Sequence, residues 1–305
     1  MQRRDFLKTS VAALVLPGGS PVRNYGWLPP FLPSQEPGFL DTFPQLEGSG
    51  NGKIVLLYKY LEAILKQPLI AHKQKGPDCT SHAGGLGIDF LQAIQKVLKR
   101  DRWINETATE VLYIGPLNII GKRKEGGIGI GEFVTFLKKY GTVFRRKYRK
   151  DFNFETYNYD NCKQLLKLFP EWLLEECKKC QIIKAHKVSS WNEAKDAIRS
   201  LYPVVIGSDV GFNNAKRDKD GFAKPDGKWY HAWLLIAIDD KFKRPGGCLM
   251  SSHGDTWVKG PRRYRQPKGS IWVDKDVLHT MLNKFGDSYA LCQLNGLKPK
   301  EYKLW

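Results

Sequence analysis

No stretch of this sequence is apolar for long enough to cross a membrane. A spanning helix needs roughly 18 or more consecutive apolar residues, and no apolar run of the chain reaches that length. We therefore expect the mature chain to have no transmembrane segment. Its 305 residues, 42% of them hydrophobic and 12% aromatic, suffice instead for a buried core in one large domain or two small ones.

Cysteine is also scarce. Six cysteines in a chain of this length are too few for a fold held together by disulfides. Cys177 and Cys180 form the only CxxC pair, and no second CxxC or histidine pair at zinc spacing accompanies it. We therefore expect no metal and no cofactor. The pair itself is expected to be a local disulfide or two free thiols.

Acidic residues are few relative to basic ones: 31 Asp and Glu against 49 Lys and Arg give a formal net charge of +18. The positive electrostatic field that results from this charge favours contact with polyanions, including nucleic acid, through basic stretches such as residues 138–150 and 259–268. A solvated basic surface with no dedicated partner explains the charge equally well. No zinc-finger or RNA-binding signature is present.

The N-terminus resembles a bacterial twin-arginine export signal. Residues 3–8 read Arg-Arg-Asp-Phe-Leu-Lys, and a short apolar run over 11–16 ends at Pro17. We predict an export signal over residues 1–20, which implies a periplasmic or extracellular protein; if the signal is not used, the protein is cytoplasmic. Residues 21–50 are rich in proline and glycine and are expected to be a linker, or a strap on the surface of a domain formed by residues 51–305.

Helical periodicity dominates the first part of that domain, and strand patterns dominate the second. This order predicts an α+β protein with a helical half over about 51–200 and a β half over about 201–295. The glycine-rich residues 126–131 lack the preceding strand and the Lys-Ser/Thr of a phosphate-binding loop, so we do not expect them to bind phosphate. The predicted helices are 55–65 (helix or turn), the segment from Cys79 onward, 110–117, 132–140, 161–179 and 191–201; the predicted strands are 203–207, 229–239, 247–252, 269–273 and 288–294.

Cys79 is placed where a thiol becomes reactive. It follows the turn Lys75-Gly-Pro-Asp78 and opens an apolar helical stripe, so the helix N-terminus favours its thiolate. Asp78 is expected to cap that helix, although its charge opposes thiolate formation. A base must reach the thiol, and His231, at the start of a long apolar strand, is the best candidate among six histidines.

Four segments resemble papain-like cysteine peptidases, in the order of that family. Residues 74–83 (Gln-Lys-Gly-Pro-Asp-Cys-Thr-Ser-His-Ala) resemble the nucleophile segment, and residues 230–232 (Tyr-His-Ala) the histidine segment. Residues 251–257 match the spacing of the Asn-Ser-Trp-Gly…Trp block, and 269–273 resemble the closing strand. The likeness covers about residues 70–275. It implies a helical half, carrying the nucleophile helix, packed on an antiparallel sheet or barrel half.

The resemblance also implies a role for each matching residue. Cys79 would be the nucleophile and His231 the general base and acid, while Gln74 and the Cys79 N–H would stabilise the oxyanion. Ser251 stands where the family has the asparagine that orients the histidine, and His253 stands where it has the shielding tryptophan.

The sequence leaves two functions open. The first is a cysteine-dependent hydrolase, a peptidase that attacks an amide bond through an acyl-enzyme. The second is a weak or inactive papain-fold binding or structural protein that acts through its basic surface. In an alternative register Cys79 is a structural cysteine, and His82 then stands at the nucleophile position, which would make the protein inactive.

Overall fold

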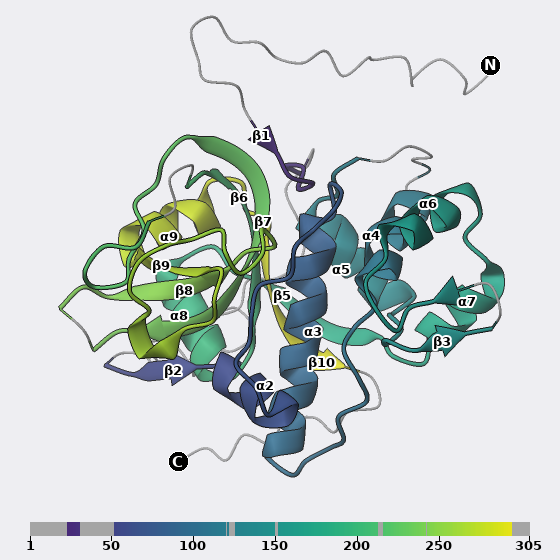
Figure 1. Cartoon of the computed structure of the whole chain (residues 1–305), viewed down its shortest axis with the longest axis horizontal. Coiled ribbons are helices and arrows are strands. Elements are labelled where there is room, and N and C mark those ends of the chain that lie inside the picture. Colours follow the sequence, from purple (N-terminus) through teal and green to yellow (C-terminus); the bar gives the residue numbers. More distant parts are fainter. Residues whose placement is uncertain are drawn as a thin grey trace, which may run out of the picture.

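Two lobes lie on either side of a long central helix in the computed structural model (Figure 1). The structure describes residues 23–30, 52–119, 121, 126–149, 152–212, 216–241 and 243–294. The predicted export signal and most of the predicted linker lie outside these residues.

One lobe is mainly helical. The helix predicted over 161–179 is two helices, because Pro170 begins a new turn there: proline lacks an N–H and disfavours helix in the residue before it. No helix in the described part of the chain is both long and apolar enough to cross a bilayer. The elements of the first half are β2 (Ile54–Leu56), α2 (Tyr58–Leu65), α3 (Cys79–Val97), α4 (Thr109–Ile119), α5 (Ile130–Lys139), β3 (Lys147–Tyr148), β4 (Phe152–Asn153), α6 (Tyr159–Lys167) and α7 (Glu171–Cys177).

The central helix α3 begins at Cys79, as the sequence predicts. Nearly all of its side chains are buried, because other elements cover it on several sides. Glycine permits this close packing: a Cβ on Gly84 would lie 2.0 Å from the Phe133 ring of α5, and one on Gly87 would lie 3.0 Å from Leu291. The N-terminus of α3 is therefore held firmly between the lobes.

The second lobe is built on a sheet with the order β5-β10-β6-β7-β8-β9, antiparallel along this path. Strands β1 and β2 also pair with β7, β1 in parallel and β2 antiparallel. Together with the helices, this sheet gives the α+β fold that the sequence predicts. The remaining elements are β1 (Arg23–Asn24), β5 (Ile182–Lys187), α8 (Trp191–Arg199), β6 (Val204–Val210), β7 (Lys228–Asp239), β8 (Gly246–Met250), β9 (Ser270–Asp274), α9 (Lys275–Asn283) and β10 (Ser288–Leu294).

Helices and strands are less strictly separated along the chain than expected. Strand β5 and helix α9 are additions to the predicted elements, and β5 joins the sheet by pairing with β10. Helix α8 packs against β6, β7 and α9, and Figure 1 shows α8 and α9 together in the sheet lobe. The chain therefore enters the sheet lobe before residue 200.

Candidate active site

The thiol of Cys79 lies at the junction of the two lobes. Its side chain is fully buried at the first residue of α3. The Sγ atom accepts a hydrogen bond of 3.3 Å from the backbone N–H of Ala232 in β7. The thiol of the central helix therefore contacts β7 at Ala232, the residue that follows His231.

Burial keeps this thiol neutral. It raises the pKa of Cys79 to about 12, the Ala232 N–H acts in the opposite direction, and the negative charge of Asp78 raises the pKa further. Asp78 occupies the N-cap position of α3, as predicted, but its carboxylate makes no capping hydrogen bond. That carboxylate accepts a 2.5 Å hydrogen bond from the Tyr157 hydroxyl and lies 3.3 Å from Nε2 of His82.

His231 is enclosed by rings. Its side chain is fully buried, stacked on His253 with centroids 4.5 Å apart, and edge-on to Trp233 and Tyr25. Burial lowers the pKa of His231 well below its usual value, and the charges of His253 and His82 lower it further. Within the described residues, neither ring nitrogen has a hydrogen-bond partner. Burial therefore favours the neutral form of both the thiol and the imidazole.

Ser251 does not orient the imidazole here. Its hydroxyl donates to the Gly269 carbonyl at 3.1 Å and accepts the backbone N–H of His253 at 3.3 Å. His253, in the position of the shielding tryptophan, instead stacks directly on His231. The ring of His231 is therefore positioned by aromatic packing and not by a hydrogen bond.

Gln74 reaches the site as an oriented amide. Its Oε1 accepts a 2.5 Å hydrogen bond from the Ser252 hydroxyl, which leaves Nε2 to donate. Nε2 donates to the carbonyls of Tyr25 at 2.8 Å and Gly76 at 2.7 Å. Ser252 was not predicted as a site residue, and nothing in the sequence distinguishes it from Ser251 for this purpose. The Gln74 amide thus already holds a peptide carbonyl, that of Tyr25.

Residues 23–30, which we call the strap, cross from one lobe to the other at this point. Strand β1 pairs with Trp229 and Tyr230 of β7, and the Tyr25 N–H donates to the Tyr230 carbonyl at 2.8 Å. Further along, the Gly26 carbonyl accepts the Ile128 N–H at 2.9 Å, beside α5 of the helical lobe. Residues 23–30 therefore make backbone hydrogen bonds to both lobes.

At Gly26 the strap lies directly against the turn that precedes Cys79. This glycine has φ +113°, a conformation that disfavours L side chains. A Cβ at this position would lie 2.0 Å from the Pro77 carbonyl oxygen and 2.7 Å from the Asp78 nitrogen. The ring of Tyr25 meanwhile packs on His231, His253 and Trp229. The strap therefore contacts Gln74, His231 and the turn that precedes Cys79.

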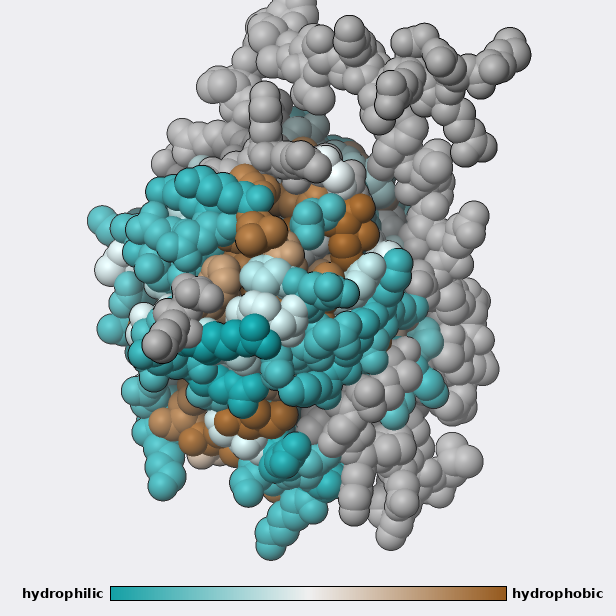
Figure 2. Space-filling view, turned by 90° about the vertical axis from the view of Figure 1, so that its right-hand side faces the viewer, coloured by the Kyte–Doolittle hydropathy of each residue, from teal (hydrophilic) through white to brown (hydrophobic). Residues whose placement is uncertain are grey.

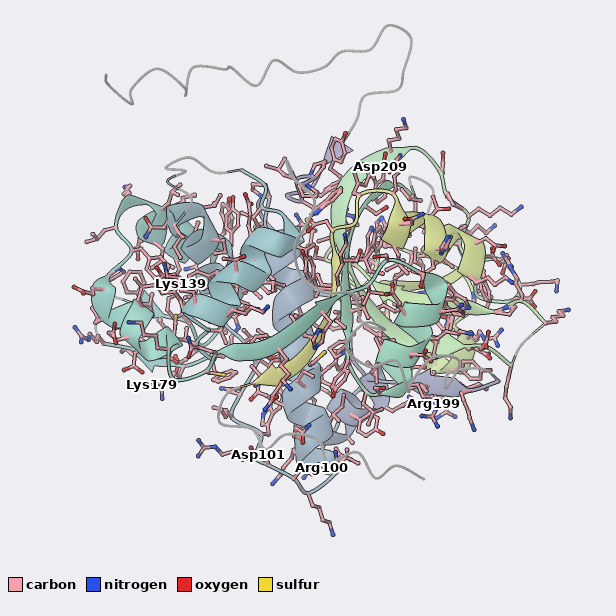
Figure 3. All side chains as sticks on the ribbon, turned by 180° about the vertical axis from the view of Figure 1, so that it is seen from behind. Arg100, Asp101, Lys139, Lys179, Arg199 and Asp209 are labelled. Carbon is pink, nitrogen blue, oxygen red and sulfur yellow. The ribbon has the colours of Figure 1, made fainter. Side chains whose placement is uncertain are left out.

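The predicted basic stretches are only partly available to a partner. Arg145 is buried and ion-paired with Glu110, and Arg263 pairs with buried Asp239. Lys139 and Lys179 lie on the outside of the helical lobe (Figure 3). The face of that lobe in Figure 2 is mainly hydrophilic, with separate apolar areas near its top and bottom. The stretch at 259–268 leaves these basic residues exposed: Lys259, Arg262, Arg265 and Lys268.

The remaining cysteines do not join the site. All six cysteines lie in the described part of the chain, where they are buried and form no disulfide, Cys177 and Cys180 included. No group of three or more His, Cys, Asp and Glu side chains among the described residues is arranged to hold a metal ion.

A helix that begins with a cysteine, packed against an antiparallel sheet whose long strand carries a histidine, is the architecture of the papain-like cysteine proteases, and this chain has that fold. Xylellain, a cysteine protease from Xylella fastidiosa, has a TM-score of 0.61 at 14% identity, over 92% of this chain and 97% of xylellain. Digestive procathepsin L 3 of Tenebrio molitor has a TM-score of 0.49 at 12% identity, over 88% and 74% of the two chains.

A third solved structure contains the cysteine protease and lectin-like domains of Cwp84 from Clostridium difficile. It has a TM-score of 0.47 at 14% identity, over 88% of this chain and 61% of that one. No protein-family model and no curated protein sequence matches the chain. The similarity to known proteins therefore lies in the fold.

Proposed function

We propose that the chain is a cysteine-dependent hydrolase, a peptidase, that the strap holds in a latent form. Cys79 is the nucleophile, His231 the general base and acid, and Gln74 the side-chain donor to the oxyanion. One observation carries the proposal: the Gln74 amide, beside the turn that leads to Cys79, binds the backbone carbonyl of a peptide segment, the strap. The carbonyl of the peptide bond to be cleaved needs the same hydrogen bond from the Gln74 amide.

The reaction follows from these positions. His231 takes the thiol proton, and the Cys79 sulfur attacks the carbonyl carbon, whose oxygen becomes negative and is stabilised by Gln74 Nε2 and the Cys79 N–H. His231 then gives the proton to the leaving amine as the C–N bond breaks, which leaves a thioester. Water, deprotonated by His231, attacks the thioester; the acid is released and the thiol is restored.

Latency has a physical basis in the same contacts. Burial keeps both Cys79 and His231 neutral, and the strap occupies the amide of Gln74. Departure of the strap admits water to both groups, which removes much of the desolvation that opposes a thiolate–imidazolium pair. The N-terminus of α3 then favours the thiolate. We therefore expect activity only from molecules in which the strap is displaced.

The test compares the full chain with a Trp27→Ala variant that weakens the strap. In that variant, a fluorogenic peptide mixture should be hydrolysed, and Cys79→Ala should abolish the hydrolysis. Cys248→Ala, which removes another buried free thiol, is the matched control and should leave the rate unchanged. Hydrolysis that persists without Cys79 would contradict the proposal.

A second candidate is a papain-fold binding protein with little or no activity. It is favoured by the unpartnered ring nitrogens of His231 and by the engagement of Ser251 with Gly269. It predicts that the opened variant binds peptides but does not cleave them. Polyanion binding by the exposed basic residues is compatible with either candidate. It predicts retention on DNA that falls steeply with salt and does not depend on sequence.

We also propose that the protein is exported through its twin-arginine signal. The support is the sequence of residues 3–8 followed by a short apolar run. Changing Arg3 and Arg4 to lysine should leave the protein in the cytoplasm, as cell fractionation would show. Undiminished export of that variant would contradict the proposal.

A further inference from the structure

Asp78 occupies an unfavourable place for a cysteine-dependent hydrolase. It directly precedes Cys79, and its side chain is only 1% exposed. Burial and the negative charge of Asp78 both raise the pKa of the thiol. A buried carboxylate is tolerated where hydrogen bonds and an opposite charge replace its hydration. The contacts of Asp78 therefore indicate what compensates for its charge.

A hydrogen-bonded clamp explains why a carboxylate stands at this position. The Tyr157 hydroxyl donates to Oδ2 of Asp78 at 2.5 Å and accepts the backbone N–H of Lys75 at 3.2 Å. One hydroxyl thus joins both ends of the turn that separates Gln74 from Cys79. The carboxylate therefore helps to set the distance between the side-chain donor to the oxyanion and the nucleophile.

His82 lies one helical turn after Asp78, with its ring against the same carboxylate. Nε2 of His82 is 3.3 Å from Oδ2 of Asp78, and both side chains are almost fully buried. Neither ring nitrogen of His82 has a hydrogen-bond partner among the described residues. In this part of the chain, His82 is also the only side chain that forms an ion pair with Asp78. Protonation of His82 would make the pair electrically neutral.

The other groups that face His82 do not compete for the carboxylate as cations. The ring of His72 lies edge-on at 5.8 Å. Burial, with the charges of His82 and Arg145, lowers the pKa of His72 to about 3, which favours its neutral form. The ring of Tyr157 lies at 4.8 Å, and burial, with the charge of Asp78, raises its pKa. The balancing charge is therefore assigned to His82.

Each charge of the pair would by itself oppose one member of the proposed thiolate–imidazolium pair. Beyond the effect of burial, the charge of Asp78 raises the pKa of Cys79, which opposes the thiolate. Beyond burial and the charge of His253, that of His82 lowers the pKa of His231, which opposes the imidazolium. Adjacent opposite charges largely cancel at longer range. A neutral pair therefore perturbs neither catalytic group strongly.

We propose that His82 is a positioning residue of the candidate active site: it carries a proton that neutralises Asp78, so that the clamped turn does not oppose ionisation of Cys79. This inference rests on the proposed function, because it adds a residue that acts on the nucleophile of the same site. His82 acts through Asp78 and is not itself assigned any contact with substrate.

The first test follows the alkylation of Cys79 by iodoacetamide from pH 5 to 10 in the Trp27→Ala variant, by mass spectrometry. His82→Asn removes the balancing charge, so the rate profile should move to higher pH by about one unit, which is about tenfold in thiolate fraction below the pKa. His279→Asn, which removes an exposed imidazole on α9, is the matched control and should not move it. An unmoved profile for His82→Asn overturns the inference.

A double variant separates the charge of His82 from its packing. Asp78→Asn keeps the size of the side chain but removes the charge that His82 balances. In that background, the addition of His82→Asn should move the profile by less than about a third of a unit, because the two effects are coupled. Equal displacement of the profile with and without Asp78 would assign His82 a purely structural role and overturn the inference.

A further measurement uses the full chain without substitution. With 15N-labelled histidine, the side-chain nitrogen signals of His82, assigned through their contacts with the Tyr157 ring, should show a protonated imidazole at pH 6. A neutral His82 ring at this pH overturns the inference even if the variants fail to fold.

None of these readouts requires peptide hydrolysis, so the inference and the proposed function can fail separately. A displaced profile with no Cys79-dependent hydrolysis refutes the hydrolase and supports the neutral pair. Hydrolysis by Cys79 with an unmoved profile for His82→Asn refutes the neutral pair and supports the hydrolase.

Discussion

Truncation of Trp27 should convert a protected thiol into a reactive one. The side chain is fully buried and hydrogen-bonded to Asp287, so Trp27→Ala should weaken docking of the strap by about 3–5 kcal/mol, the usual cost of removing a buried tryptophan. Since each 1.4 kcal/mol is tenfold in an equilibrium constant, the ratio of open to closed strap should rise about a hundredfold to a few thousandfold. The rate of Cys79 alkylation by iodoacetamide should rise with it until the open form predominates.

Alkylation is followed by mass spectrometry of the peptide that contains Cys79, in native buffer, with Trp172→Ala as the control. Trp172 lies in α7 of the helical lobe and contacts Arg149, so its loss removes an indole but touches no part of the strap. Near-UV circular dichroism verifies that both variants remain folded. If Trp27→Ala alkylates within threefold of the unmodified chain, the strap does not control access to the thiol and the reasoning fails.

Three further outcomes follow from the same contacts. In the closed protein the raised pKa of Cys79, about 12, means that the thiolate fraction and the alkylation rate should rise about tenfold per pH unit from pH 6 to 9; a rate independent of pH would show a preformed ion pair. In the Trp27→Ala background, Gln74→Ala should lower peptide hydrolysis about 10²–10³-fold and leave alkylation unchanged, and equal losses in both would assign Gln74 a structural role. Glu110→Gln should lower the free energy of unfolding by about 3–5 kcal/mol, because it leaves buried Arg145 without its counter-ion; an unchanged urea midpoint would refute this.

The parts of the site that lie on regular elements could be predicted from local sequence. The apolar stripe of α3 and the turn before it indicate the position of Cys79, and the apolar run after His231 indicates β7. Helix α9 was predictable in principle: Asp274 precedes it, and Leu278, Met281 and Leu282 recur at helical spacing.

Contacts between distant segments could not be predicted in this way. The hydrogen bond from Trp27 to Asp287 joins residues 260 positions apart, and no local pattern indicates such a pair. Asp78 is a good capping residue in sequence terms, yet its carboxylate binds the Tyr157 hydroxyl, because a residue 79 positions away competes for it. The hydrogen-bond partners of these side chains are therefore set by residues that are distant in the sequence.

The strap and the candidate active site belong to one polypeptide, so under the proposed latency the degree of inhibition should not change when the protein is diluted. One peptide-bond cut between Pro30 and Gly52 would turn the intramolecular contact into a bimolecular one. The freed segment would then dissociate at low concentration and not rebind. Under the proposed latency, a single proteolytic event in this stretch would thus activate the protein irreversibly.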